Sequence, residues 1–233
     1  MSSPLPMDAG HDISAQQPVK EWIFWGLIAL TALYYFAELQ AVSLPDYFPI
    51  LQIRRSQWGW SYKACGIFFS CLLLVCFPWL RQNVGLRWRQ APGSWRLSLG
   101  IFCMWLAIGI LGGFYIAAEK FSLDKLLFQA TMPSMEEELT FRGIMLALLE
   151  RAFGHSPMSC RLRYGGAAFI TSLLFWHDVA IQHGNLIVPL ARVDTMIFAS
   201  LVALVRTRSG SLLWPMLIHS AGNVALSAVP MLR

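Results

Sequence analysis

Residues 97–118 read LSLGIFCMWLAIGILGGFYIAA, an apolar run that contains no charged side chain. A helix of about 20 mainly apolar residues crosses the hydrocarbon core of a bilayer, so this run predicts a membrane-spanning helix. Gly109 and Gly113 lie four residues apart within it. That G-x-x-x-G spacing lets a second helix approach closely, and we expect a helix partner along this face.

Further segments on both sides of this run predict helices, at about 22–42, 64–80, 134–149, 164–180, 184–205 and 212–232. Residues 121–131 are typical of an amphipathic connector. We find no strand pattern, internal repeat or low-complexity tract. The predicted fold class is therefore all-α, a polytopic membrane helix bundle with about seven to eight transmembrane helices. We expect residues 1–20 to be a disordered tail and residues 21–233 to form a single domain.

The composition also indicates a membrane protein. Of the 233 residues, 56% are hydrophobic and only 13% are charged, whereas a soluble domain has roughly 25% charged residues. The mean hydropathy is +0.52. Tryptophans flank the apolar runs, as they do in the aromatic belts at membrane surfaces: Trp22, Trp25, Trp58, Trp60, Trp79 and Trp95.

The net charge of +5 does not indicate a nucleic-acid partner, because the basic residues are spread between the apolar runs. The densest group is Arg81, Arg87, Arg89 and Arg96, which we expect to lie beside acidic lipids on the cytoplasmic side. The charges of the loops favour a cytoplasmic N-terminus. The five cysteines include no C-x-x-C pair, which argues against a disulfide framework or a zinc ribbon.

Three polar clusters interrupt the apolar sequence. They are Glu136-Glu137-Glu138 with Arg142, then His177, then His219 with Asn223. Ionisable side chains are costly inside a bilayer, so such residues indicate a functional site by default. Each cluster also has a structural explanation, and together they could instead hold the bundle together through hydrogen bonds between helices.

The acidic cluster fits the start of a helix near Ser134. Ser134 and Glu137 have the S-x-x-E spacing of a capping box, and Glu138 and Arg142 are spaced as an i, i+4 ion pair. If one of the three glutamates caps the helix and another pairs with Arg142, one carboxylate remains. That carboxylate could stay ionised and polarise a water molecule.

His219 and Asn223 lie four residues apart and so project from one face of a helix. An asparagine amide beside a histidine can stabilise an oxyanion at a reacting carbonyl. His177 could share the activated water, or it could be a buried histidine bonded to a backbone carbonyl. No serine or cysteine has comparable local support as a nucleophile.

These residues carry a resemblance to a known family. Residues 137–142 match E-E-x-x-x-R, residues 172–177 are similar to a motif F-x-x-x-H, and residues 215–223 contain H-x-x-x-N. In this order and spacing they resemble the CPBP family of CAAX proteases and bacteriocin-processing enzymes, which are glutamate-type intramembrane endopeptidases. The similarity spans roughly residues 100–233, which we therefore expect to be the catalytic core of an intramembrane protease domain.

The resemblance implies a role for each residue. Glu137 matches the glutamate that activates the water, and Glu138 and Arg142 match the residues that brace it. His177 matches the second-motif histidine, although Leu173 stands at the usual phenylalanine position, and His183 is the alternative. His219 and Asn223 match the pair that stabilises the oxyanion.

We therefore predict an intramembrane endopeptidase that hydrolyses a peptide bond near the membrane and needs no cofactor. Zinc held by a glutamate and two histidines is an alternative, as is a non-proteolytic scaffold or immunity protein of the same fold. The expected partners are the lipid bilayer and a peptide or protein substrate, either prenylated or carrying a leader or membrane sorting segment. We expect a multi-pass protein of a prokaryotic inner membrane.

Overall fold

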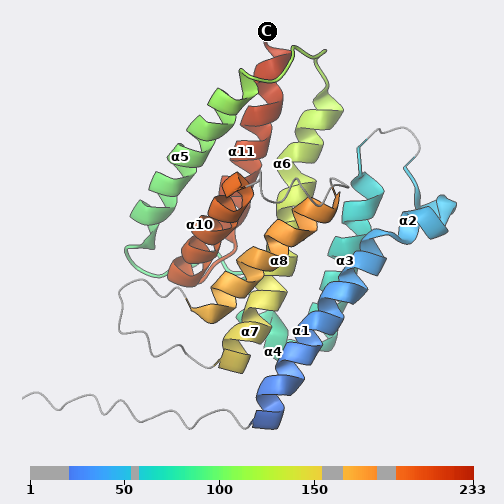
Figure 1. Ribbon diagram of the computed structural model, residues 1–233, viewed down its shortest axis with the longest axis vertical. Helices are drawn as coiled ribbons and strands as arrows, with labels where there is room; N and C mark the ends of the chain where they lie inside the picture. Colours follow the sequence, from blue (N-terminus) through green and yellow to red (C-terminus); the bar gives the residue numbers. More distant parts are fainter. Residues whose placement is uncertain (1–20, 54–57, 154–164, 183–192) are drawn as a thin grey trace, which may run out of the picture.

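The computed structural model describes residues 21–53, 58–153, 165–182 and 193–233, and every regular element among them is helical. The predicted all-α fold is therefore confirmed. Figure 1 shows three long helices, α5, α11 and α6, side by side at the end that holds the C-terminus. Helices α1 and α3 pack together on the opposite side, and α8 and α10 pack against each other.

The elements follow one another along the chain as a succession of helices. In order they are α1 Glu21–Val42, α2 Leu44–Tyr47, η1 Pro49–Leu51, α3 Trp60–Cys76, α4 Pro78–Asn83, α5 Ser94–Gly113, α6 Leu123–Glu137, η2 Glu138–Met145, α7 Leu146–Phe153, α8 Gly166–Gln182, α10 Val193–Ser209 and α11 Leu213–Met231.

The predicted helices at 22–42 and 212–232 are found within one residue at each end, as α1 and α11. The helix predicted at 64–80 is divided in two. Pro78 has no backbone N–H and forces Phe77 out of helical geometry, with φ −120° and ψ 88°, so α3 ends at Cys76 and α4 begins at Pro78. Residues 183–192 of the predicted sixth helix lie outside the described residues, and α10 begins at Val193.

Helices α1 and α5 are long and apolar enough to cross a membrane, and α3 is apolar but shorter, with 17 residues. Their outer surfaces expose large apolar side chains, among them Leu33, Phe36, Phe68 and Leu111. Large exposed apolar surfaces mark contact with a membrane or another protein. The wider count of seven to eight spans stays a prediction.

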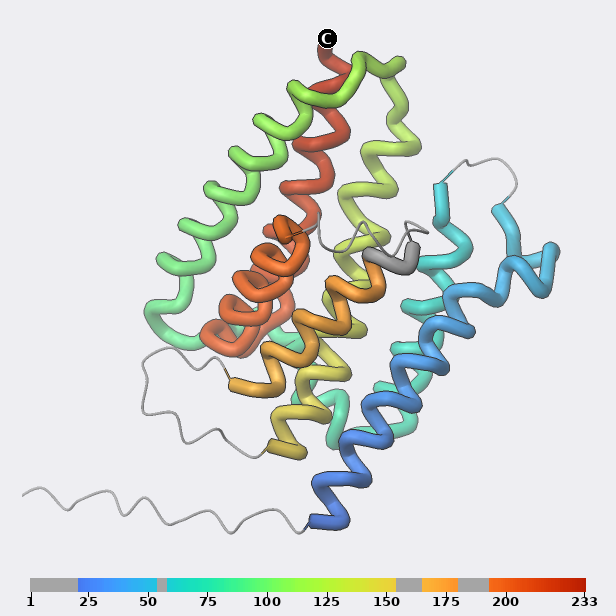
Figure 2. The backbone as a smooth tube through the Cα atoms, viewed as in Figure 1, coloured from blue at the N-terminus to red at the C-terminus, as the bar shows by residue number. Residues whose placement is uncertain are grey.

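The prediction of a connector at 121–131 and a new helix at Ser134 is wrong. Ser122 is the N-cap, its hydroxyl accepting from Lys125 N at 3.2 Å, and α6 begins at Leu123. Figure 2 shows α6, η2 and α7 running as one continuous rod. Ser134 lies inside that rod and forms no cap. Its hydroxyl donates to Thr131 O at 3.0 Å and lies 2.7 Å from the hydroxyl of Ser220 on α11.

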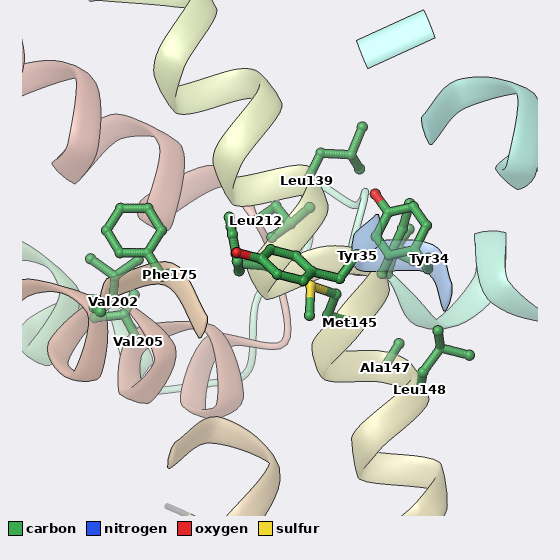
Figure 3. Packing of buried hydrophobic residues seen from close by; sticks show 14 of the residues in the cluster. Tyr34, Tyr35, Leu139, Met145, Ala147, Leu148, Phe175, Val202, Val205 and Leu212 are labelled. Atoms are coloured by element: carbon green, nitrogen blue, oxygen red, sulfur yellow. The ribbon is translucent and has the colours of Figure 1, made fainter. Parts of the chain in front are cut away.

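The middle of this rod, η2, is a π-helix whose eight residues are all buried. Stretches of π-helix are rare and occur frequently at functional sites. The apolar part of the core packs around η2. Figure 3 shows Leu139 and Met145 close to Tyr35 of α1, and Phe175 of α8 beside Val202 of α10. The polar residues of η2 are therefore enclosed by the bundle.

The predicted close helix partner of α5 is α11. A Cβ atom added at Gly109 would lie 2.7 Å from Gly222 O, and one added at Gly113 would lie 2.6 Å from Val229 Cβ. A Cβ at Gly222 would meet the Trp105 ring at 2.4 Å. The G-x-x-x-G face thus holds α11, and with it the histidine motif, directly against α5.

Candidate active site

The centre of the site is a buried ion pair in the π-helix that also holds a histidine. Arg142 Nη1 donates to Glu138 Oε1 at 3.3 Å, and neither side chain has any exposed surface. His219 Nδ1, from α11, lies 2.9 Å from the same Glu138 oxygen. The predicted Glu138–Arg142 pair is therefore present, and one carboxylate joins η2 to α11.

Aromatic rings and a backbone carbonyl complete the surroundings of Arg142. Its guanidinium lies 4.2 Å from the centre of the Phe175 ring and donates to Ala199 O at 3.3 Å. The Phe198 ring lies edge-on to the His219 ring, with their centres 4.9 Å apart. Cation–π contacts and ring packing therefore fix the orientation of both Arg142 and His219.

Glu137 lies at the other ring nitrogen of His219. Its Oε2 atom is 3.7 Å from His219 Nε2, while its Oε1 accepts from Lys63 Nζ at 2.8 Å. Glu137 is 8% exposed, whereas Glu138 is fully buried. The two neighbouring glutamates thus lie at opposite nitrogens of one imidazole, and Glu137 is the less deeply buried of the two.

The contact of His219 with Glu138 determines how the ring can act. A carboxylate at 2.9 Å from Nδ1 accepts a hydrogen bond, so Nδ1 carries a proton. Nε2 is then the nitrogen that faces Glu137. A third group that fixes the tautomer of a histidine in this way is typical of hydrolytic sites.

Glu136 belongs to a second part of the cluster, which Lys63 joins to Glu137. It accepts from Lys63 Nζ at 2.5 Å and is 3% exposed. Glu38 of α1 is equally buried. A Cβ added at Gly66 of α3 would lie 2.9 Å from Glu38 Oε1 and 3.0 Å from Glu136 Cγ, so both carboxyl groups flank this glycine.

The structure places the other two predicted residues as follows. Asn223 is half-buried one helical turn beyond His219, on the same face of α11, and its side chain forms no hydrogen bond with another described residue. His177 is exposed, and its Nδ1 lies 3.3 Å from the hydroxyl of Tyr35. No hydrogen bond or ion pair among the described residues joins His177 to Glu137 or His219. His183 lies outside the described residues.

Sequence reasoning missed Lys63 and Phe175 as parts of this cluster. The sequence contained one signal for Lys63. Lys63 and Glu38 are charged residues in apolar stretches of sequence, and such residues predict partners on other helices. No such signal exists for an aromatic ring in an apolar helix.

Among the described residues, no group of three His, Cys, Asp or Glu side chains is arranged to hold a metal ion. The charged cluster instead combines four carboxylic acids with one lysine and one arginine. Opposite charges within hydrogen-bonding distance compensate for the loss of water around buried ions. What the arrangement offers is an oriented imidazole beside a second buried carboxylate, Glu137.

Comparison with known proteins identifies the family. The family of type II CAAX prenyl endopeptidases, Rce1-like, matches residues 119–225. The chain carries an Rce1-like domain. This confirms the family resemblance predicted from the three motifs, and a domain of this family implies an intramembrane protease. No curated protein and no solved structure matches the chain.

The Rce1-like domain begins just before α6 and ends within α11, so it contains Glu137, Glu138, Arg142, His219 and Asn223. Lys63 and Glu38 lie outside it, on the N-terminal helices α3 and α1. The charged cluster is therefore shared between the Rce1-like domain and the helices that precede it.

Proposed function

We propose that this protein is an intramembrane endopeptidase in which Glu137 activates a water molecule for attack on a peptide carbonyl. The observation that carries the proposal is the position of His219, held by Glu138 through Nδ1 at 2.9 Å with Nε2 turned toward Glu137. Activation of water by a carboxylate and stabilisation of an oxyanion by an oriented donor are complementary tasks.

The reaction begins when Glu137 Oε2 takes a proton from the water as its oxygen bonds to the carbonyl carbon. An imidazolium at His219, between Glu137 and Glu138, would donate from Nδ1 to Glu138 and from Nε2 to the oxyanion. Asn223, on the same face of α11, supplies a second donor. The C–N bond then breaks, and Glu137 returns the proton to the leaving amine, which gives one carboxylic acid and one amine.

Two further parts of the proposal concern place and substrate. The apolar outer surfaces of α1, α3 and α5 support a multi-pass protein in a lipid bilayer, which we assign to a prokaryotic inner membrane. The substrate is a peptide or protein with its scissile bond close to the membrane. A prenylated C-terminus, a leader or a membrane sorting segment would each bring it there.

The test is cleavage by the purified full chain, in proteoliposomes, of a fluorescence-quenched peptide with a farnesylated cysteine near its C-terminus. The expected result is cleavage by the wild type and a loss of at least about 10²-fold in kcat for Glu137→Gln, since general-base catalysis contributes about 10²–10⁴-fold. A folded Glu137→Gln protein that cleaves at the wild-type rate would falsify the mechanism.

If the farnesylated peptide is not cleaved, the membrane proteomes of a wild-type strain and a Glu137→Gln strain are compared. Uncleaved peptides that accumulate only in the variant strain then identify the substrate. Identical proteomes would favour the non-proteolytic scaffold. Repeating the peptide assay with a strong chelator separates the zinc-dependent alternative, which predicts loss of cleavage and recovery on adding Zn²⁺.

A further inference from the structure

Lys63 lies where a helix outside the Rce1-like domain meets the acidic motif. It is in the first turn of α3, and its Nζ atom lies 2.5 Å from Glu136 Oε2 and 2.8 Å from Glu137 Oε1. The side chain is only 12% exposed. A lysine ammonium has three N–H donors, and two of them are directed at the two carboxylates.

The contact affects Glu137 in two ways. A cation at 2.8 Å favours the ionised form of a carboxyl group, which is the form that can accept a proton from water. The contact also occupies Oε1 and leaves Oε2, the oxygen that lies 3.7 Å from His219 Nε2. One ion pair thus determines both the charge of Glu137 and the oxygen that is available for reaction.

The surface of α3 is shaped for this contact. Gly66 follows Lys63 by three residues, on the same face of the helix. Because Gly66 has no side chain, α3 approaches Glu38 and Glu136 so closely that an added Cβ atom would require these side chains to shift. The lysine is therefore part of a fitted interface between α3, α1 and α6.

We propose that Lys63 is a positioning residue of the active site, which keeps Glu137 ionised and presents its Oε2 atom to the water and His219. The inference rests on the proposed role of Glu137 as the base. The charged and titratable groups around Glu137 come from each element packed at the site: Glu38 of α1, Lys63 of α3, Glu136 of α6, Glu138 and Arg142 of η2, and His219 of α11.

The experiment follows ionisation of Glu137 directly and needs no substrate. The full chain, labelled with ¹³C at glutamate carboxyl groups, is titrated with acid in detergent micelles while its infrared carboxylate bands are recorded. Subtracting the spectrum of Glu137→Gln isolates the band of Glu137. In Lys63→Met we expect the midpoint of this band to move up by at least about one pH unit, a tenfold change in proton affinity.

Further variants separate positioning from simple charge balance. Lys63→Met with Glu136→Gln removes one charge of each sign, which preserves the net charge of the cluster and protects the fold. We expect the raised midpoint to persist in this double variant and to return to the wild-type value in Lys63→Arg. Lys125→Met is the matched control, because Lys125 forms an ion pair with Glu119 near the other end of α6, roughly 18 Å away along the helix.

The inference is overturned if the midpoint in Lys63→Met and in the double variant equals that of the wild type. It is also overturned if the double variant alone restores the wild-type midpoint, because Lys63 would then serve only to neutralise Glu136. Neither result bears on Glu137 as the base, which the activity of Glu137→Gln tests by itself. The two ideas can therefore fail separately.

Discussion

Arg142 and Glu138 are fully buried charges, and their environment explains how the fold tolerates them. Each has a partner from a different element: the guanidinium contacts Ala199 O and the Phe175 ring, and the carboxylate contacts His219. Removing one member of a buried pair leaves an uncompensated charge, which is far more costly than loss of a surface pair.

Arg142→Met is therefore expected to lower the free energy of unfolding by roughly 3–5 kcal/mol. The measurement is denaturant-induced unfolding in mixed micelles. Arg151→Met is the control, since Arg151 also lies over an aromatic ring, Trp79, at 4.3 Å, but is exposed. Its loss should cost only about 0.5–1 kcal/mol. Equal effects of the two substitutions would contradict a buried, structural Arg142–Glu138 pair.

Glu138→Gln tests whether the contact with His219 matters for catalysis. An amide in place of the carboxylate can donate to Nδ1 and so favour the other tautomer, in which Nε2 carries the proton. The amide has no negative charge, so it no longer stabilises the imidazolium form of His219. We expect kcat to fall by at least about 10²-fold, while KM changes little. Glu119→Gln, at the exposed ion pair with Lys125, is the control. A wild-type kcat in Glu138→Gln would show that His219 acts without its partner.

At the scale of elements, the site depends on how α11 is held against the rest of the bundle. Helix α11 carries His219 and Asn223, and its closest approach is to α5 through Gly109, Gly113 and Gly222. Because packed interiors transmit small displacements, a change at this helix pair shifts His219 relative to Glu137 and Glu138.

Gly109→Ala should therefore reduce both stability and activity. The new methyl group would lie 2.7 Å from Gly222 O, and overpacking of this kind costs about 1–3 kcal/mol. Gly100→Ala is a control within the same helix, because nothing lies within 4 Å of its added Cβ atom. We expect that variant to be neutral or stabilised, by up to about 1 kcal/mol. The comparison is made by unfolding and peptide cleavage, and a tolerated Gly109→Ala would rule out the close contact.

At the scale of the whole molecule, the apolar exterior predicts that the bilayer covers surfaces that are open in the isolated protein. Cys71 of α3 and Cys103 of α5 are exposed on these outer faces. A thiol reacts as its thiolate, which does not form in hydrocarbon.

In intact membranes we expect a water-soluble maleimide to leave Cys103 unmodified, and to modify it after the protein is denatured in SDS. Trp88→Cys is the positive control, because Trp88 is 85% exposed in the loop between α4 and α5. Peptide mass spectrometry measures both sites. Rapid labelling of Cys103 in membranes would place α5 outside the bilayer.

The sequence alone determined the helical fold, the bounds of α1 and α11, the glycine face of α5 and the family. These features depend on local information: apolar periodicity, residue size and motif spacing. The break at Pro78 also had a local cause. The start of α6 at Leu123 was missed because charged turns inside a membrane bundle have the composition of a helix terminus.

Only the tertiary structure decided which charges meet. Sequence spacing places Glu138 and Arg142 on one helix, but it carries no information on the distance from Lys63 to Glu137 or from His219 to Glu138, because these residues lie on different helices. The tertiary structure likewise placed Phe175 against Arg142 and His177 beside Tyr35. Periodicity defines the face of a helix, whereas packing of the whole bundle defines what that face contacts.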